Sequence, residues 1–462
     1  MSDASSPPPV QREGLVRALG VRALATNMVN LTIGSGIFVL PAVVAAQLGP
    51  AAVLAYVVCA VAMGLVMACF AEAGSRVARS GGAYAYTETA FGPYVGFIVG
   101  VLLWFCFGVL AHAAVANVLA GTLASAVPAL SSRPAQIAVM ALITGGLALL
   151  NVRGVKEGAR FAQVATLVKL VPLVVLMVAG LPAIDGANLA WTGAPDAGRV
   201  ASMALVLFFA FGGSESALSS SGEIREPART IPRAIVLAML VVLVFYLVLQ
   251  TVAQGVLGAA LATAGATPLA DAAGRVMGGP GRTLLLVGAG LSMFGLLGGD
   301  LLSNPRALFA QARDGFFFAP LARAHPRFHT PHVAIAAYAG LAFVLAATGV
   351  FEKLAALASA GLMVIYLTVC LAVIVLRRRG VEEAGPPFLL PGGLTIPLLG
   401  AAVIGWLLVH TPAPQFRDLA IILAVSSVAF FFRRKGGAGD RAEEGKTGGE
   451  EEARGAAPDG LA

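Results

Sequence analysis

The chain has 462 residues, of which 58% are hydrophobic and only 12% are charged. Soluble globular proteins are about 45–50% apolar and about 25% charged, so this composition excludes an ordinary water-soluble enzyme and predicts a polytopic, all-α membrane protein in a lipid bilayer. The formal net charge is +7. The basic residues are spread over separate loops instead of forming one stripe, so no nucleic-acid partner is expected.

The two ends of the chain are polar. The first thirteen residues include Pro7, Pro8 and Pro9 and lack an apolar core followed by a small-residue cleavage site, so we expect no cleaved signal peptide. Residues 1–21 are predicted to be a cytoplasmic segment. Residues 436–462 are rich in glycine and charge and cannot bury enough apolar surface to fold, which predicts a disordered cytoplasmic tail.

Apolar stretches long enough to cross about 30 Å of hydrocarbon at 1.5 Å per residue predict about twelve transmembrane helices between these ends. The stretches are 22–47, 51–75, 93–122, 134–151, 158–181, 200–221, 233–256, 283–310, 332–350, 354–376, 389–410 and 416–432. The region 93–127 fits either one long tilted helix or two shorter segments, and this choice would invert the orientation of every later helix.

The distribution of basic residues favours one helix in that region. With the amino terminus inside, twenty Lys and Arg residues fall on the cytoplasmic side, and outside fall only Arg133, Arg199, Arg275, Arg282, Lys353 and Arg417. Because Lys and Arg are enriched in cytoplasmic loops, both termini are predicted to be cytoplasmic. We therefore expect a multi-pass protein of the cell membrane, of the bacterial inner-membrane kind.

Two of the predicted helices are interrupted by glycine. The first contains Thr-Ile-Gly-Ser-Gly-Ile-Phe at 32–38, and the sixth contains Phe-Ala-Phe-Gly-Gly-Ser at 209–214, about 178 residues later. Each glycine costs a helix about 1 kcal/mol relative to alanine, so both segments favour unwinding. Unpaired backbone is tolerated at membrane depth only beside protein or a water-filled cavity, so the pair predicts a binding site at the midplane. The alternative is close helix packing through small residues.

The interruptions lie five helices apart, an odd number, so two related units would insert with opposite orientation as an inverted repeat. Broken helices present amides to an anion and carbonyls to a cation. An α-amino acid, with a carboxylate and an ammonium separated by one carbon, is the simplest ligand that matches both.

The interrupted segments and several other motifs resemble the amino acid, polyamine and organocation permeases over almost the whole chain. The matching residues are Gly34 to Phe38 with Pro41, Glu72, Gly74, Ser75, Ser80 to Tyr86, Phe209 to Gly212, Glu215, Glu223, Pro227, Arg229, Ile231 to Arg233, Arg306, Ala312 to Gly315 and His325 to Arg327. The resemblance implies the five-plus-five inverted repeat of the leucine-transporter fold, with repeats at 22–181 and 200–376, two further helices at 389–432 and no hydrolysis step.

The resemblance also implies a substrate site at the interruptions, formed by Ile33, Ser35, Gly36, Ile37, Phe209, Ala210, Phe211 and Gly212. Amides near Ser35, Gly36 and Ile37 would bind the substrate carboxylate, and carbonyls of the second group would bind its ammonium. Phe209 stands where such permeases keep an aromatic lid, although an ordinary core or lipid-facing phenylalanine is the alternative.

Lys169 lies in the middle of the predicted helix 158–181, where an ionisable group costs at least about 2.5–3.5 kcal/mol without a partner. Sodium-coupled relatives of this fold hold the first and eighth helices together with a sodium ion, and permeases resembling this chain can place a lysine ammonium there. The ammonium is either a permanent charge bonded to backbone carbonyls or a group that titrates with coupled protons. Transport is predicted to be independent of sodium.

Two carboxylates are further candidates for coupling. Asp300 departs from the small or polar residue that the family would lead us to expect, and an ion pair with Lys169 is favoured over a pair with Arg306. Glu215 follows the second interruption by two residues and is a candidate proton-responsive group. Its alternative role is to bond amides of the first helix and hold the broken segments together.

Trp104, His112 and Asn117, on the third predicted helix, are further candidates to line the pocket. The histidine and cysteine spacings do not match a metal site, and no nucleophile elbow or P-loop lysine is present, so we expect no metal, no cofactor and no enzyme activity. Nothing in the sequence specifies an oligomeric state.

The sequence therefore predicts a secondary transporter of an amino acid, linked to protons or to exchange. Small residues at the interruptions favour a neutral cargo, because Glu215 and Asp300 are assigned other roles. A basic amino acid or polyamine antiporter and an amino acid exporter are the alternatives. A channel or a membrane sensor fits less well, since no filter repeat or attached soluble domain is visible.

Overall fold

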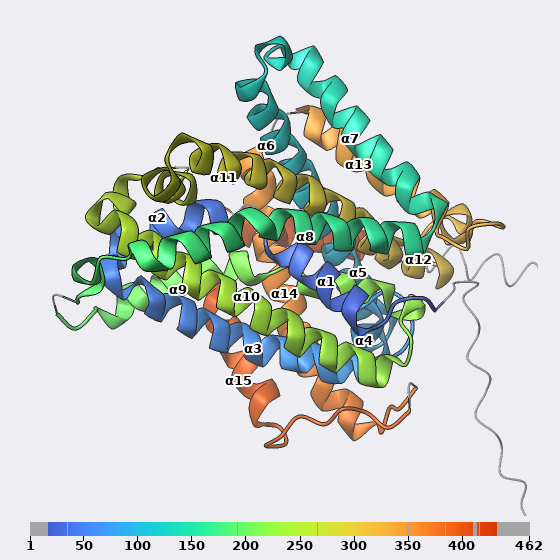
Figure 1. Cartoon of the computed structure of the whole chain (residues 1–462). Coiled ribbons are helices and arrows are strands. Elements are labelled where there is room, and N and C mark those ends of the chain that lie inside the picture. The colour runs from blue at the N-terminus through green and yellow to red at the C-terminus, as the bar shows by residue number, and fades with distance from the viewer. Residues whose placement is uncertain are drawn as a thin grey trace, which may run out of the picture.

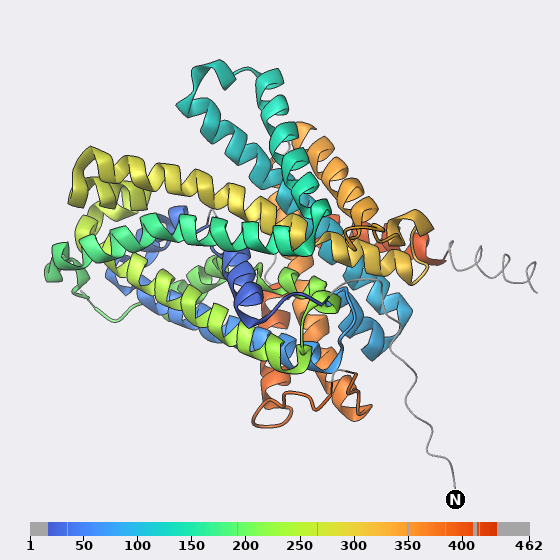
Figure 2. The ribbon, with the colours of Figure 1, turned by 45° about the vertical axis from the view of Figure 1, so that its right-hand side comes forward.

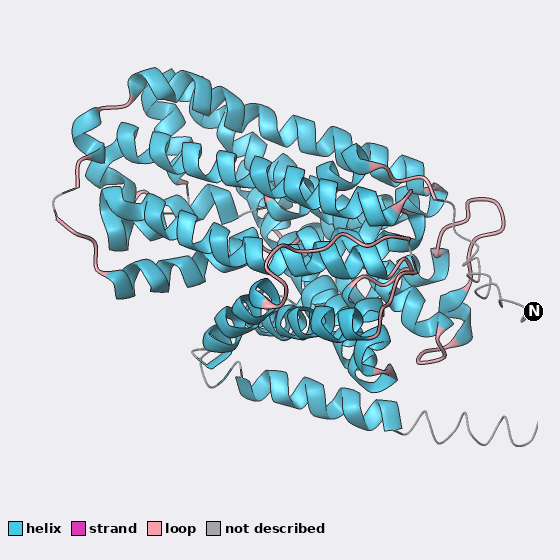
Figure 3. Ribbon diagram, turned by 90° about the horizontal axis from the view of Figure 1, so that it is seen from below, coloured by secondary structure: helices cyan, strands magenta, loops and turns pink. Residues whose placement is uncertain are grey.

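A computed structural model of the chain describes residues 17–34, 36–191, 193–265, 267–348, 351–383, 385–409, 414 and 416–431, leaving aside the side chains of 125, 126, 205, 209, 351–357 and 359. Helices make up nearly all of this part of the chain (Figure 3). Within it, a single β-bridge joins Leu19 to Ile224. The predicted tail at 436–462 lies outside the described residues.

The α-helices follow one another along the chain with short connections (Figure 1). They are α1 (Val21–Thr32), α2 (Gly36–Leu48), α3 (Ala52–Arg76), α4 (Ala83–Phe91), α5 (Pro93–Val101), α6 (Ala111–Ala126), α7 (Arg133–Arg153), α8 (Val155–Gly180), α9 (Ala197–Phe211), α10 (Pro227–Leu257), α11 (Pro268–Ser303), α12 (Pro305–Arg313), α13 (His332–Thr348), α14 (Phe351–Arg378) and α15 (Thr395–Val409). Residues 416–431 are also helical. A π-helical segment, Leu102–Leu110, joins α5 to α6, and a 3₁₀ segment, Ser214–Glu223, follows α9.

Among the described residues, seven helical stretches are long and apolar enough to cross a membrane: Gly36–Arg76, Pro93–Ala124, Arg133–Arg153, Val155–Ala183, Pro227–Thr263, Pro268–Arg313 and Ala360–Arg378. Three shorter apolar helices cover Ala197–Phe208, His332–Thr348 and Thr395–Val409. About 20 apolar residues span the hydrocarbon core, so the protein is a multi-pass helical membrane protein. The total of twelve spans stays a prediction.

Two elements differ from the sequence-based expectation. The region between the second and third predicted spans contains α4, a short helix with a polar face that a search for long apolar stretches does not detect. The helix predicted at 283–310 begins instead at Pro268, as part of α11. Gly278 has φ 71° and kinks α11. Arg282 pairs with Asp271 at 3.3 Å. Because these polar residues interrupt the apolar pattern, the sequence did not indicate the first part of this helix.

The long helices pack side by side as a bundle. α8 packs along α11, α3 packs along α10 and α9, and α1 lies against α8 and α10. In Figures 1 and 2 the short α1 is surrounded by these long helices, while α6 and α7 extend together from one side of the bundle. The unwound ends of α1 and α9 are therefore enclosed by protein, which can supply hydrogen-bond partners to their backbone.

Buried ion pairs join helices at one end of the bundle. The Glu72 carboxylate on α3 accepts hydrogen bonds from Arg76 at 2.9 Å and from Arg377 of α14 at 2.5 Å. Arg306 of α12 pairs with Glu223 at 3.2 Å, and both side chains are fully buried. Removing one partner of such a pair would leave an uncompensated buried charge, so these contacts fix α14 and the 3₁₀ segment to their neighbours.

Candidate substrate site at two helix interruptions

The first interruption separates α1 from α2. Helical geometry ends at Thr32, and Ile33 has φ −76° and ψ 79°, outside the helical region. The Gly34 amide turns back to donate to the Thr32 carbonyl at 2.8 Å. Ser35 lies outside the described residues. The glycine-rich sequence therefore unwinds where the low helix propensity of glycine predicts it.

The second interruption separates α9 from the 3₁₀ segment. Gly213 has φ 122°, a left-handed conformation that residues with a side chain rarely adopt. A Cβ atom at this position would lie 2.6 Å from the Leu31 carbonyl oxygen of the first interruption. Glycine is thus required at 213 for two reasons, and its contact with Leu31 brings the two interruptions together.

Side chains tie the two interruptions to each other. The Thr32 and Ser214 hydroxyl oxygens are 2.6 Å apart. The Tyr246 hydroxyl, on α10, lies 2.8 Å from the Ala210 carbonyl and 3.2 Å from the Thr32 carbonyl. These polar groups pair the backbone that unwinding exposes, as a buried site requires.

The Lys169 side chain bonds backbone carbonyls of the first interruption. Its ammonium donates to the Asn30 carbonyl at 2.6 Å and to the Ile33 carbonyl at 2.5 Å. The Ser292 hydroxyl of α11 also donates to the Ile33 carbonyl, at 3.0 Å. The side chain of Lys169 is fully buried. The Lys169 amine therefore lies at the carbonyl end of α1, where the helix dipole would stabilise a cation.

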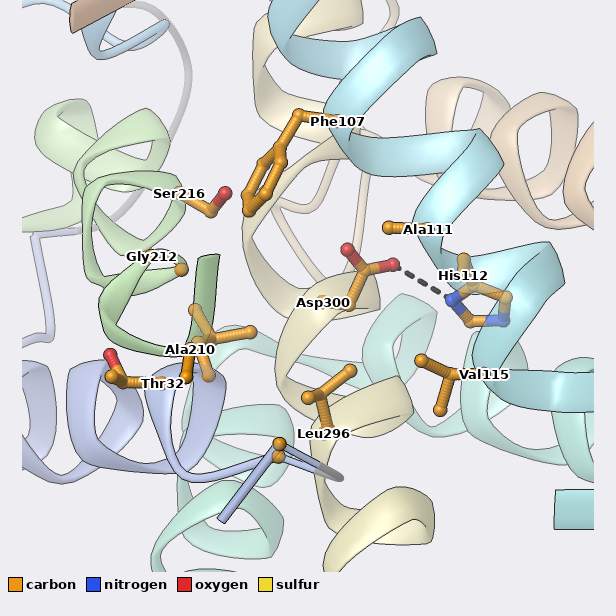
Figure 4. Close-up of a pocket in the computed structure, with 14 residues that line it drawn as sticks. Thr32, Phe107, Ala111, His112, Val115, Ala210, Gly212, Ser216, Leu296 and Asp300 are labelled. Atoms are coloured by element: carbon orange, nitrogen blue, oxygen red, sulfur yellow. Dashed lines mark hydrogen bonds and ion pairs between the residues drawn. The ribbon is translucent and has the colours of Figure 1, made fainter. Parts of the chain in front are cut away.

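A cavity of about 90 Å³ opens beside the interruptions (Figure 4). Its lining comes from the first and second interruptions, α6 with the π-helical segment, and α11: Leu31, Thr32, Gly34, Gly36, Phe107, Ala111, His112, Val115, Ala210, Gly212, Gly213, Ser216, Leu296 and Asp300. Two interrupted helices and two continuous ones thus enclose a single cavity.

Asp300 does not pair with Lys169 or with Arg306, so both predicted pairings are wrong. Its carboxylate accepts hydrogen bonds from His112 Nδ1 at 2.8 Å, the Tyr338 hydroxyl at 2.8 Å and Asn304 Nδ2 at 2.6 Å. The physical reason is the rotation of α11, which presents Asp300 to α6 and α13. Lys169 instead extends from α8 towards α1.

Glu215 binds the second interruption instead of the first. Both oxygens of its carboxylate lie 3.0 Å from the Gly213 amide nitrogen, and the Tyr366 hydroxyl of α14 lies close by. The side chain is fully buried. The predicted alternative, bonding to amides of the first helix, is not the arrangement found, because the carboxylate turns back to the amide two residues before it.

Five of the predicted site residues line the cavity: Gly36, Ala210, Gly212, His112 and Asp300. Their association from four separate regions of the sequence is the main structural support for the predicted site. The role of each residue in transport stays a prediction.

Other predicted residues lie elsewhere. Ile37 is buried, and the Phe211 ring packs edge-on against Tyr246 with centroids 4.8 Å apart. The Trp104 indole donates to Gln311 at 2.7 Å. Asn117 donates to the Ala346 carbonyl at 2.7 Å. Ile33 contributes its carbonyl to Lys169, and the Phe209 side chain lies outside the described part, so the aromatic lid stays a prediction.

Sequence reasoning missed Phe107, Ser216 and Leu296 in the lining. Figure 4 shows the Phe107 ring pointing into the space between Ser216 and Asp300. Phe107 belongs to the π-helical segment, a rare conformation that often occurs at functional sites. Its sequence is uniformly apolar and gives no signal for the change in helical winding.

Substitution of Gly36 is expected to close the carboxylate side of the cavity. A Cβ at this position would lie 3.2 Å from Ala210 Cβ, and the branched valine side chain would extend further into the lining. Gly36→Val should therefore lose ligand-induced thermal stabilisation while remaining folded in the membrane. Gly64→Val on α3 is the control, because nothing lies within 4 Å of a Cβ at 64. Normal ligand binding by purified Gly36→Val would contradict the assignment.

Comparison with known proteins agrees with this architecture. The sequence profile of the family described as "Amino acid permease" matches residues 19–431. The chain is 27% identical over 447 residues to a methylthioribose transporter of Bacillus subtilis (strain 168), covering 91% of this chain and 94% of that protein.

Two further relatives come from the same organism. The serine/threonine exchanger SteT is 28% identical over 381 residues, which cover 80% of this chain and 85% of SteT. The branched-chain amino acid permease BcaP is 28% identical over 451 residues, which cover 91% of this chain and 93% of BcaP. The match to the family extends over nearly all of the chain, and the resemblance to amino acid, polyamine and organocation permeases is confirmed. The chain belongs to the amino acid permease family of membrane transporters.

Proposed function

We propose that the protein is a secondary transporter that carries a neutral amino acid across the membrane by alternating access. It is linked to protons or to exchange of cargo, and it does not use sodium. The observation that carries this proposal is the single cavity enclosed by two interrupted helices, one from each predicted repeat. Interrupted helices that face each other at a cavity are the usual substrate site of inverted-repeat transporters.

The cavity provides backbone groups that suit both charged ends of an amino acid. The cargo carboxylate would bind the first-turn amides of α2, near Gly36 and Ile37, since helix N-termini bind anions. The cargo ammonium would bind carbonyls at the end of α9, around residues 209–212. The Ala210 carbonyl already accepts from Tyr246 at 2.8 Å, which holds it in position.

The apolar lining supports a neutral cargo. Phe107, Ala111, Val115 and Leu296 offer hydrocarbon surface to a cargo side chain. Among the relatives, a serine/threonine exchanger and a branched-chain amino acid permease are named for neutral amino acids, and two others are named for cationic ones, so the proposal of a neutral cargo rests on the lining.

The wider architecture is proposed to follow the same fold. Helices of 22–181 and 200–376 would form the two inverted repeats, with the two remaining helices at 389–432. The direct contact between the two interruptions, at Gly213 and Leu31, supports this pairing. The excess of basic residues in alternate loops supports cytoplasmic termini in a cell membrane of the bacterial inner-membrane type.

A ligand screen tests the proposed cargo class. The purified protein would be heated with each of the twenty amino acids, since a ligand that binds only the folded state raises the melting temperature. We expect one or more neutral amino acids to stabilise the protein and lysine and arginine not to do so. Stabilisation by basic amino acids alone, or by none of the twenty, would contradict the proposal.

The Glu215 carboxylate is expected to make transport depend on pH. If proton binding to this buried group is part of the cycle, uptake should vary between about pH 5 and 8. Glu215→Gln should flatten the profile, because glutamine has the same shape, stays neutral and still accepts a bond from the Gly213 amide. Glu157→Gln at the exposed start of α8 is the control. A pH profile of Glu215→Gln identical to that of the parent would assign Glu215 a structural role.

A further inference from the structure

The cavity wall carries one hydrogen-bonded pair of ionisable side chains, His112 and Asp300, among the described residues. His112 Nδ1 and Asp300 Oδ2 are 2.8 Å apart, and the side chains are 0% and 7% exposed. They come from α6 and α11, the two helices that face the interruptions across the cavity. Neither side chain contacts Lys169 or Glu215, so the pair is separate from the groups that hold the interruptions.

A second hydrogen bond holds the imidazole in place. His112 Nε2 lies 3.4 Å from the Thr144 hydroxyl, which can donate to it. With a proton on Nδ1, the imidazole donates to Asp300. The Asp300 carboxyl group therefore lies as a hydrogen-bond acceptor in the wall of a mostly apolar cavity.

Asp300 retains the capacity to accept one more hydrogen bond. A carboxylate has about four acceptor positions, and Asp300 accepts from His112, Tyr338 and Asn304. These three donors fix its orientation. Figure 4 shows one carboxylate oxygen directed at His112 and the carboxyl group placed at the cavity, opposite Gly212 and Ser216.

A cargo bound as proposed would direct its side chain towards this carboxylate. Its carboxylate and ammonium groups would occupy the interruptions on α2 and α9, and the opposite wall is formed by α6 and α11. Ala111, Val115 and Leu296 line the same cavity as the Asp300 carboxyl group and add hydrocarbon surface to it (Figure 4). The cargo side chain therefore meets one strong acceptor within an apolar surface.

We infer that Asp300 is a specificity-determining residue that accepts a hydrogen bond from a hydroxyl group on the cargo side chain, and that His112 is its positioning residue. The inference rests on the proposed function and names the class of cargo: a small neutral amino acid with a side-chain hydroxyl. The size of the cavity, about 90 Å³, favours a short side chain over a long cationic one. Lys169, which donates to the carbonyl of Ile33 next to Gly34, would also repel a second cation wherever its amine is protonated.

Isosteric amino acids provide the most direct test. Threonine and valine have nearly the same shape and differ in a hydroxyl against a methyl group, and serine and alanine differ by one hydroxyl. A site built to bond a hydroxyl rejects the analogue that lacks it, because its own polar group is left unpaired. Dissociation constants measured on the purified protein should be at least about tenfold lower for threonine than for valine, and likewise lower for serine than for alanine.

Substitutions test whether the His112–Asp300 pair causes the preference for threonine over valine. In Asp300→Leu the ratio of valine to threonine dissociation constants should fall to about one, through weaker threonine binding. In His112→Gln the same ratio should fall, because threonine binding should weaken more than valine binding. A purely structural role for His112 would weaken both ligands together. Asp271→Leu, near the start of the same helix and outside the cavity lining, is the control and should keep the parent ratio.

The possible failures are distinguishable. If no amino acid binds, the proposed function fails. If valine binds as tightly as threonine and alanine as tightly as serine in the parent, this inference alone is wrong, and it is also wrong if lysine binds more tightly than threonine. If Asp300→Leu still prefers threonine, the threonine hydroxyl binds a group other than Asp300, and the inference is wrong. The comparison in the parent decides the matter even if Asp300→Leu does not fold.

Discussion

Replacing Lys169 by alanine is expected to reduce initial uptake by about 100-fold or more while cargo binding falls much less. The ammonium donates to the Asn30 and Ile33 carbonyls at 2.6 and 2.5 Å and is fully buried. Each hydrogen bond to a charged group contributes about 1.5–3 kcal/mol, so the loss of two bonds corresponds to a decrease in uptake of about 100-fold or more. The proposed cargo contacts remain, so the change should act on the balance between open and closed states.

Uptake into proteoliposomes and binding to the purified protein should be measured on the same preparation. Lys156→Ala is the matched control, because Lys156 is exposed on the same helix. An ion pair between Asp300 and Lys169 would have given both variants the same defect. Because Asp300 bonds His112 instead, Asp300→Asn is not expected to reproduce the Lys169 defect. Near-parental uptake by Lys169→Ala would show that the ammonium is dispensable for transport.

Gly213→Ala is expected to abolish transport and to lower the melting temperature of the purified protein by several degrees. Its φ of 122° is strained for any residue with a Cβ, at a cost of about 1–3 kcal/mol. The added Cβ would also lie 2.6 Å from the Leu31 carbonyl oxygen, where backbone must shift. Both effects separate the two interruptions that form the cavity.

The control for this change is Gly290→Ala on α11, where nothing lies within 4 Å of an added Cβ. Melting temperature and uptake of both variants should be compared with the parent. A Gly213→Ala protein with parental stability and uptake would show that the second interruption tolerates an ordinary backbone and would remove the structural basis of the site.

The interruptions could be predicted from the sequence because they arise from local properties. Glycine lowers helix stability wherever it occurs, and the two clusters, near Gly34 and Gly212, stand out against apolar helices. Lys169 was equally visible, since a charge in the middle of an apolar segment needs a partner. The resemblance to the permease family then predicted that these positions lie together at one substrate site.

The partner of Asp300 could not be predicted in the same way. Its contacts to His112 and Tyr338 depend on how α11 is rotated relative to α6 and α13, and the sequence of α11 is apolar on most of its surface. Phe107 was missed because π-helical winding changes which face a residue presents. Helix α4 was missed because it is only nine residues long.

The central claim, sodium-independent transport of a neutral amino acid, is tested most directly by initial uptake of radiolabelled alanine, valine and threonine into proteoliposomes. Sodium would be replaced by choline, with and without a pH gradient or unlabelled amino acid inside. We expect at least one of the three to enter at the same rate in sodium and in choline, and to respond to the pH gradient or to the internal amino acid. Strict dependence on sodium, or no uptake of any of the three, would contradict the account.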